Sequence, residues 1–314
     1  MTLSRRTVLA SGLAATAAPR AWAAPRLAYA LAPRRVADGL WMIEGSTEYF
    51  DFDNGGDIVN IAFAETGAGA VIFDTGPSRR YGEELRRVVT ETVPRGIAAV
   101  VNSHQHPDHF LGNQVFADVP IHALDGTAAQ IAQHGDAYAD AMYRLLGDWM
   151  RGTEPVPPTN VLASTDLTIG GRSFAAVPMA GHTTADLVLL DRRTGVAMAG
   201  DLAFLDRAPT TPDADIPLWR DALDAIAALK PQAIVPGHGP FDPEGRSLTQ
   251  TRAYLDWLDG ALSDAAEEGL DMVETMQRPL PERFAAMGAQ PQEYERSVSH
   301  LFGDYEKAAL PEVN

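Results

Sequence analysis

The segment His104-Gln105-His106-Pro107-Asp108-His109 decides the fold that this sequence predicts. It follows the continuous apolar run 97–101, which is typical of a strand buried on both faces. Neutral imidazole and carboxylate groups bind Zn, Fe, Mn or Ni. In an extended or turn backbone, His104 and His106 point to one side and can share an ion. Asp108 and His109 then fall where a second ion would lie, so the segment predicts a metal site.

Three later segments add further nitrogen and oxygen donors, namely Gly181-His182-Thr183, Gly200-Asp201 and Gly237-His238-Gly239. Each follows a short apolar run that reads as a strand, so each candidate ligand is expected just beyond a strand end. Loops at the edge of a rigid sheet present side chains precisely, and glycine permits the sharp turns. We therefore expect the three segments to complete one cluster.

An isolated histidine is more often a surface or core side chain than a ligand. Here five of the eight histidines fall in these segments together with two aspartates, which favours ligand roles for the set. The other three, His122, His134 and His300, have no such context and are interpreted as structural or exposed.

Apolar periodicity and turn residues predict two strand-rich halves with helices outside them. Strands are expected at 40–43, 58–63, 70–73, 97–101, 119–123, 166–169, 172–177, 187–190, 196–199 and 233–235. Helices are expected at 80–93, at 128–150 with an interruption near Gly135, at 217–229, and over most of 246–309. This order predicts a four-layer αββα sandwich of the α/β class, formed as a single domain over 39–314.

The N-terminus reads as an export signal. Ser4-Arg5-Arg6-Thr7-Val8-Leu9 resembles the bacterial twin-arginine motif, an apolar stretch follows, and Ala21-Trp22-Ala23 fits a cleavage site. The sequence thus predicts a signal peptide over 1–23, a flexible leader over 24–38, and a periplasmic mature protein. An ordinary basic, alanine-rich tail is the alternative interpretation.

Composition narrows the ligands and the partners. The chain of 314 residues has no cysteine, so disulfides, thiolate metal sites and cysteine nucleophiles are excluded. The formal net charge is −17, and without residues 1–23 it becomes −20, from 22 basic and 42 acidic residues. An acidic surface disfavours nucleic acid and anionic lipid as partners. No segment is long and apolar enough for membrane insertion. With nucleic acid and membranes disfavoured, the expected partner is a small-molecule substrate.

The pattern H-x-H-x-D-H, then G-H, G-D and G-H-G, resembles the metallo-β-lactamase superfamily. The resemblance implies that His104, His106 and His182 hold a first zinc ion and that Asp108, His109 and His238 hold a second. It implies that Asp201 bridges both ions. Iron or manganese are possible replacements for zinc.

Within that superfamily, NSHQHPDHFLGN and GDLAF…VPGHGP resemble the quinoprotein relay system zinc metallohydrolases and their SoxH-like relatives. This narrower resemblance implies a functional link to periplasmic quinoprotein dehydrogenases. The chain departs from class B1 β-lactamases, because it lacks their cysteine ligand and has almost no lysine to bind a substrate carboxylate. Antibiotic hydrolysis is therefore expected to be incidental at most.

The expected reaction is hydrolysis of an ester, thioester or lactam-like bond by a hydroxide that bridges two zinc ions. Asp108 is the predicted catalytic residue, because it can orient the hydroxide and pass its proton to the leaving group. Two alternatives stay open: an iron-dependent oxidoreductase of the persulfide dioxygenase type, and a non-enzymatic periplasmic module that binds metal or a partner.

Some residues are weaker candidates. Asp74 is placed either as a carboxylate that fixes a ligand imidazole or as an aspartate that starts a turn. Asn102 and Thr183 are similar but weaker. The aromatic segment 49–56 is either a lid over the metals or a plain hairpin turn.

Overall fold

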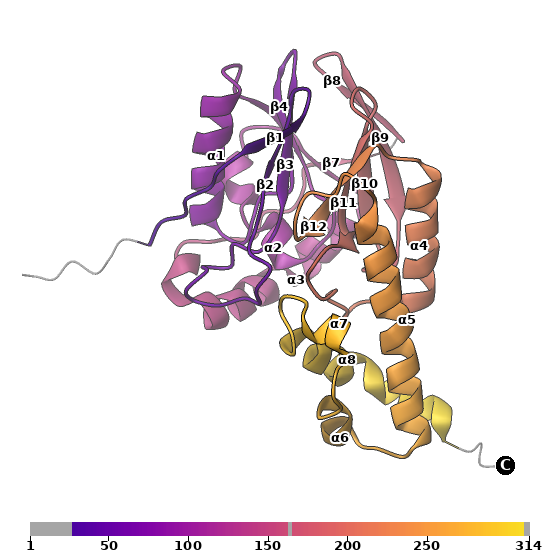
Figure 1. Cartoon of the computed structure of the whole chain (residues 1–314). Helices are drawn as coiled ribbons and strands as arrows, with labels where there is room; N and C mark the ends of the chain where they lie inside the picture. The colour runs from indigo at the N-terminus through magenta and orange to yellow at the C-terminus, as the bar shows by residue number, and fades with distance from the viewer. Residues whose placement is uncertain (1–26, 163–164, 311–314) are drawn as a thin grey trace, which may run out of the picture.

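A computed structural model of the chain describes residues 27–162 and 165–310. Two β-sheets face each other, and helices cover the outer face of each sheet (Figure 1). The predicted αββα sandwich is therefore confirmed. The predicted signal peptide, residues 1–23, lies outside the described residues.

The first sheet contains, among the described residues, seven strands in chain order. β1 to β4 are antiparallel neighbours, and β4 to β7 run parallel. The strands are β1 (Arg34–Ala37), β2 (Leu40–Ile43), β3 (Ile61–Thr66), β4 (Gly69–Phe73), β5 (Ile97–Val101), β6 (Ile121–Ala123) and β7 (Asn160–Val161).

The second sheet has the order β12-β11-β10-β9-β8, with β11 and β12 parallel and the other neighbours antiparallel. Its strands are β8 (Asp166–Ile169), β9 (Arg172–Met179), β10 (Asp186–Asp191), β11 (Val196–Phe204) and β12 (Ala233–His238). β11 is buried over its whole length, because it lies inside the sheet and is covered on both faces.

Helices flank the sheets on both sides (Figure 1). On the side of the first sheet lie α1 (Arg79–Thr92) and α3 (Asp125–Leu146), and on the other side lie α4 (Ile216–Ala228) and α5 (Arg246–Glu267). The last helices lie below the sandwich in Figure 1, across the edge where the predicted ligands are found. They are α6 (Met272–Met276), α7 (Glu282–Ala285) and α8 (Gln292–Ala309). The short elements are α2 (Pro107–Phe110), η1 (Asn113–Phe116) and η2 (Gly147–Met150).

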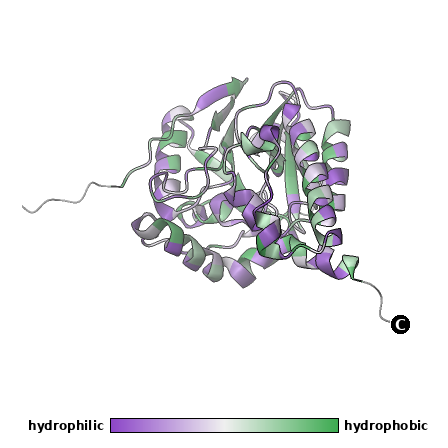
Figure 2. Ribbon diagram, turned by 60° about the horizontal axis from the view of Figure 1, so that its bottom comes forward, coloured by the Kyte–Doolittle hydropathy of each residue, from purple (hydrophilic) through white to green (hydrophobic). Residues whose placement is uncertain are grey.

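The core consists of three hydrophobic layers, because alternate residues of a strand point to opposite faces. In β4, Ile72 packs toward α1 and α3, whereas Val71 and Phe73 pack between the sheets. In β11, Met198 packs between the sheets and Ala197 packs toward the helices of the second sheet. Figure 2 shows the same separation, with hydrophobic strands inside and hydrophilic residues on the outward turns of the helices.

The predicted interruption of the long helix near Gly135 is wrong. α3 runs without a break from Asp125 to Leu146, and the chain leaves it at Gly147, where φ is +54°. Gly135 is a packing position, since a Cβ there would lie 2.7 Å from the Pro155 side chain. The glycine therefore allows the loop after η2 to approach the helix.

The prediction of a flexible leader is wrong for residues 27–38. Tyr29 and Leu31 are buried, and β1 pairs with β2. The Tyr29 hydroxyl donates to the Gly55 carbonyl at 2.6 Å, and Arg80 donates to the Leu27 carbonyl at 2.8 Å. Burial of the tyrosine ring against Trp149 and Tyr81 explains why this segment is ordered.

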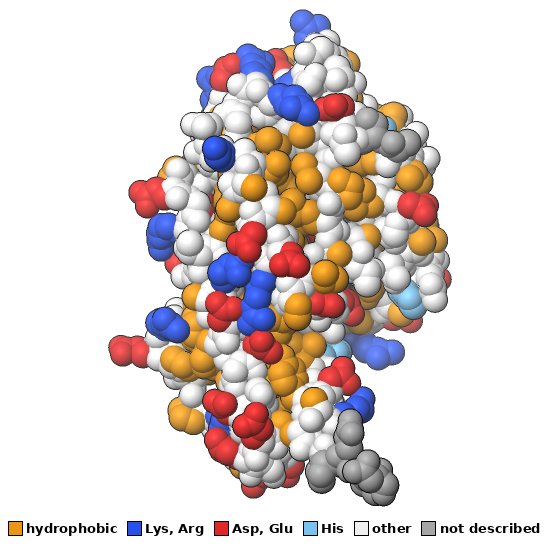
Figure 3. All heavy atoms as spheres, turned by 90° about the vertical axis from the view of Figure 1, so that its right-hand side faces the viewer, with side chains coloured by type: hydrophobic (Ala, Val, Ile, Leu, Met, Phe, Trp, Pro, Cys, Tyr) orange, Lys and Arg blue, Asp and Glu red, His pale blue; other side chains and the backbone are white. Residues whose placement is uncertain are grey.

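The surface of the described residues carries charges of both signs. Figure 3 shows acidic and basic side chains interspersed with apolar ones on one face. Many are paired at the surface, such as Arg220 with Asp256 at 2.6 Å. Among the described residues, no helix combines the length and apolar character that a membrane crossing needs.

Candidate metal centre

The seven predicted ligands lie together at one edge of the sandwich, although they come from four separate segments. They fall into two groups whose ligand atoms lie within 4.8 Å of one another. All seven side chains are buried, with at most 6% of any residue exposed. The first group is His104, His106, His182 and Asp201, and the second is Asp108, His109 and His238.

The elements that carry these residues come from both sheets. His104 follows β5, and the short helix α2 presents Asp108 and His109 one after the other. Asp201 and His238 lie within β11 and at the end of β12, so the prediction that every ligand follows a strand is wrong for these two. The β11–β12 register is irregular after Met198, which lets the strand continue while Asp201 turns toward the cluster.

Asp201 lies between the two groups. Its Oδ1 is 3.1 Å from His109 Nε2, and its Oδ2 is 3.2 Å from His238 Nε2 and 3.4 Å from His182 Nε2. One carboxylate thus faces imidazoles of both groups. This is the position that a bridging ligand requires.

The donor set fits divalent metal ions. Ligands about 2.0–2.2 Å from a tetrahedral zinc ion lie roughly 3.4 Å apart, which matches most of these separations. His104 Nε2, His109 Nε2 and Asp201 Oδ1 are buried and have no hydrogen-bond partner among the described residues. Buried polar atoms are rarely left unpaired, so their convergence indicates a ligand that they share.

Asp74 and Ser103 orient two of the imidazoles. Asp74 Oδ2 lies 2.8 Å from His109 Nδ1, and the Ser103 hydroxyl lies 2.9 Å from His104 Nδ1. Asp74 also accepts from the Ser103 backbone N–H at 2.7 Å. These contacts occupy Nδ1 of both rings and leave Nε2 to face the cluster. Asp74 thus holds the imidazole of the candidate ligand His109, which is one of the two roles that its sequence context allowed.

Two other imidazoles are also held from outside. His238 Nδ1 donates to the Ile58 carbonyl at 2.8 Å, which leaves Nε2 facing Asp201. His106 is turned the other way: its Nε2 contacts Asp213 at 2.8 Å, and its Nδ1 faces His182 Nε2 at 2.8 Å. Asp213 and Ser103 were not among the residues predicted from the sequence. Ser103 belongs to the stretch NSHQHPDHFLGN, but no spacing in that stretch marks its hydroxyl as a partner of an imidazole, and Asp213 lies in no motif.

Gly237 shows how tightly the backbone encloses Asp201. A Cβ at this position would lie 1.9 Å from Asp201 Oδ1, so no other residue fits without moving the carboxylate. Asn60 supports the same turn, because its amide donates to the carbonyls of Pro236 and Gly239 at 2.9 and 2.7 Å. The glycine before His238 is therefore a requirement of close packing.

Burial and neighbouring charge set the protonation of the first group. Burial holds the pKa of His104 and of His182 well below the usual histidine value. Both rings are thus neutral near pH 7, which is the form that binds metal.

Around His109, neighbouring carboxylates have a larger effect on the pKa than burial has. Burial acts to lower the pKa of His109, yet Asp201, Asp108 and Asp74 outweigh it and raise that pKa well above the usual value. Burial would raise the pKa of Asp201, but His238 and His109 hold it well below the usual range. A metal ion that binds here therefore displaces a proton from the cluster.

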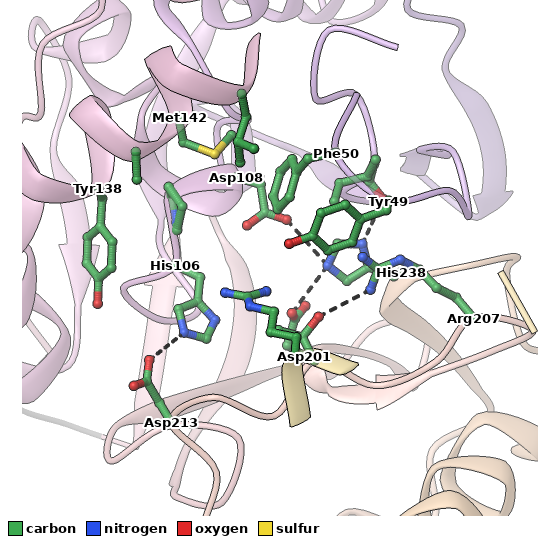
Figure 4. A pocket seen from close by; sticks show the side chains of 16 residues that line it. Tyr49, Phe50, His106, Asp108, Tyr138, Met142, Asp201, Arg207, Asp213 and His238 are labelled. Carbon is green, nitrogen blue, oxygen red and sulfur yellow. Dashed lines mark hydrogen bonds and ion pairs between the residues drawn. The ribbon is translucent and has the colours of Figure 1, made fainter. Parts of the chain in front are cut away.

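A pocket opens onto the cluster (Figure 4). His106, Asp108, Asp201 and His238 form part of its wall, and Tyr49 and Phe50 line it from the β2–β3 loop. The aromatic start of segment 49–56 thus faces the pocket, as the lid interpretation requires. The middle of that segment is held by a hydrogen bond, since Trp149 Nε1 donates to the Phe52 carbonyl at 2.8 Å.

The other residues weighed from the sequence lie around the cluster. Asn102 donates to the Asn113 side chain at 3.1 Å, and Thr183 donates to Asp186 at 2.7 Å. Both stabilise the loops that carry ligands. His122, His134 and His300 belong to neither of the two donor groups.

Comparison with known sequences and structures agrees with this geometry. The sequence profile described as the Metallo-beta-lactamase superfamily matches residues 54–238. A linear primary-alkylsulfatase from a Pseudomonas strain is 24% identical over 284 residues, covering 75% of this chain and 53% of that protein. An acyl-coenzyme A thioesterase from Homo sapiens is 24% identical over 193 residues, covering 55% and 66%. The chain thus spans less than two thirds of either relative.

Solved structures share the fold. A metallo-β-lactamase from Pontibacter korlensis has a TM-score of 0.60 at 22% identity, covering 72% of this chain and 99% of that one. A metallo-β-lactamase from Hirschia baltica has a TM-score of 0.56 at 21% identity, covering 72% and 97%. At such identities the likeness concerns the fold alone.

Proposed function

This chain belongs to the metallo-β-lactamase superfamily, and on that premise we propose that it is a dinuclear zinc hydrolase of a small molecule. The observation that carries the proposal is the convergence of two donor groups on the two sides of Asp201. The proposed bond is an ester, a thioester or a lactam-like amide.

The donor set supports zinc and supports two ions. The chain has no cysteine, so every ligand is an imidazole or a carboxylate, which zinc accepts readily. The complete second group (Asp108, His109 and His238) favours two ions over the single iron of a persulfide dioxygenase. When bound, such ions supply Lewis acidity: they lower the pKa of water from 15.7 to about 7 and polarise the oxygen of the scissile bond.

Asp108 is the residue to which we assign proton transfer. Its Oδ2 lies 3.4 Å from His238 Nε2 and 3.6 Å from His109 Nε2, and the residue lines the pocket. A carboxylate held there can take a proton from the attacking water and return it to the leaving group. The outer contacts of the imidazoles keep the surrounding groups in place during that transfer.

The names of the relatives suggest which bonds to test. One is called an alkylsulfatase and the other an acyl-coenzyme A thioesterase, so a sulfate ester and a thioester belong in a substrate panel beside a carboxylic ester and a cephalosporin.

The decisive experiment combines metal analysis with that panel. We expect purified protein to contain two zinc ions per chain and to show turnover that a chelator removes. Asp108→Asn should lower kcat at least a hundredfold, whereas Asp118→Asn, an exposed acid paired with Arg86, should change nothing. One iron per chain with oxygen consumption would support the dioxygenase instead. Bound zinc without any turnover would favour a non-enzymatic module.

The cellular setting is a separate part of the proposal. The twin-arginine motif and the A-x-A site support export to the periplasm, and the resemblance to the quinoprotein relay group supports a link to quinoprotein dehydrogenases. Arg5→Lys together with Arg6→Lys should leave the protein unexported, as measured by cell fractionation. Periplasmic recovery of that variant would contradict the twin-arginine route.

A further inference from the structure

Arg296 is a cation at the metal pocket that comes from α8, outside the segment that matches the superfamily. Its side chain is 32% exposed, and it lines the same pocket as His106, Asp108 and Asp201. Among the described residues its guanidinium donates no hydrogen bond, and its ion-pair contact is 3.9 Å long, from NH1 to Glu293 Oε2. That distance is too long for a hydrogen bond.

Glu293 is already neutralised by a different arginine. Arg207 donates to its Oε1 at 3.1 Å and Thr210 donates to the same atom at 2.7 Å, and both Arg207 and Glu293 are fully buried. Because Arg207 and Thr210 already bind Glu293, the contact of Arg296 with that carboxylate is long, and the N–H groups of its guanidinium keep their hydrogen-bonding capacity at the pocket wall. An arginine fork in such a place is suited to bind an oxyanion through two parallel hydrogen bonds.

The pocket also has an apolar wall. Phe50, Ile58, Met142 and Leu145 line it, and in the view of Figure 4 the labelled Phe50 and Met142 lie on the side away from Asp213. The cluster of candidate ligands thus has an apolar surface and a partly exposed arginine beside it. A molecule that contacts the candidate ligands, the apolar wall and Arg296 carries a hydrolysable bond, an alkyl or aryl part and an anionic group.

We propose that Arg296 is a specificity-determining residue that binds the oxyanion group of an amphiphilic anionic substrate, whose apolar part packs against Phe50 and Met142. The inference rests on the proposed hydrolase function and adds the substrate class to it. It also explains how a chain with a net charge of −17 recognises an anion, because the cation is local and partly desolvated.

Binding to the zinc-loaded protein tests this directly, with calorimetry as the readout and octyl sulfate and 1-octanol as matched probes. Arg296→Gln should weaken octyl sulfate binding by about ten- to a hundredfold and leave 1-octanol unaffected. Arg296→Lys should recover part of the loss, because it keeps the charge but not the fork. Lys307→Gln is the matched control: it removes one positive charge from the same helix at an exposed site.

The outcomes separate the two proposals. Unchanged octyl sulfate binding in Arg296→Gln would overturn the inference, as would an equal loss for both probes or an equal loss in Lys307→Gln. Unchanged zinc content and thermal unfolding show that the variants are folded. If the wild type hydrolyses nothing in the panel while its anion binding depends on Arg296, the hydrolase proposal fails and the binding inference holds. If the enzyme is active, Arg296→Gln should raise KM for anionic esters alone.

Discussion

The candidate metal ligands and the rim of the pocket above them are held in different ways. The outer nitrogens of His104, His106, His109 and His238 each contact another group at 2.8–2.9 Å. On the rim, the ion pair of Arg296 with Glu293 is 3.9 Å long, and Phe50 belongs to a loop. A site for chemistry needs donors fixed to a fraction of an ångström, whereas a site for selectivity needs only complementary surface. On the two proposals made above, the sandwich supplies reactivity, and α8 and the β2–β3 loop supply the choice of substrate.

The largest expected effect comes from the centre of the ligand cluster. Asp201→Ala removes the carboxylate that faces both donor groups, so zinc content should fall to one ion or fewer and kcat/KM should drop at least a thousandfold. Elemental analysis and steady-state kinetics measure both, with Asp118→Asn as the control. More than a tenth of wild-type activity would contradict the central position of Asp201.

The second-largest effect tests how far the contacts that hold the candidate ligands from outside contribute to zinc affinity. Asp74→Asn keeps the size of the side chain but loses the charge that supports His109 and Ser103. We expect zinc affinity to fall by about ten- to a hundredfold, as is usual for outer-shell partners of metal ligands. Competition with a chromogenic chelator measures this affinity. Unchanged affinity would show that the imidazole is held by packing alone.

A smaller effect is expected on the rim. Phe50→Ala removes part of the apolar wall, and burial of such a ring contributes about 2 kcal/mol. KM for substrates with an alkyl or aryl group should rise about tenfold, while kcat and zinc content stay the same. A fall in zinc content would show that the rim and the ligand cluster are not independent.

The smallest effect concerns the loop that joins both regions, since Phe50 lines the pocket and the Ile58 carbonyl holds His238. Burial raises the pKa of Asp57, in the same loop, from 3.8 to about 6. The folded state therefore binds this proton more tightly than the unfolded state, so stability is lost as pH rises from about 4 through 6. Asp57→Asn removes that cost.

The stabilisation by Asp57→Asn should thus be greater at pH 8 than at pH 5, by roughly 1 kcal/mol in the free energy of unfolding. Urea unfolding of zinc-free protein at both pH values measures it, since the metal would add its own pH dependence. A gain that is the same at both pH values would show that the carboxyl is not the cause.

Much of the fold followed from local patterns. β5, β2 and β8 have the predicted bounds, and α1 and α4 differ from prediction by one residue at each end. A buried strand and an amphipathic helix carry their periodicity within a short stretch of chain. The break at Gly135 was predicted wrongly, because the glycine serves a contact with Pro155 that no local pattern reveals.

The sequence by itself determined the seven candidate ligands, since residue type and position beside strands carry that information. Only the tertiary structure decided which groups hold the outer nitrogens of the imidazoles and which residues form the rim of the pocket. Asp213 meets His106 across 107 positions of the chain, and Glu293 meets Arg207 across 86. The fixed conformation of residues 27–38 also depends on contacts with distant residues such as Trp149. Such contacts arise from the packing of whole elements against one another, and packing leaves no periodic or motif-like trace in the chain.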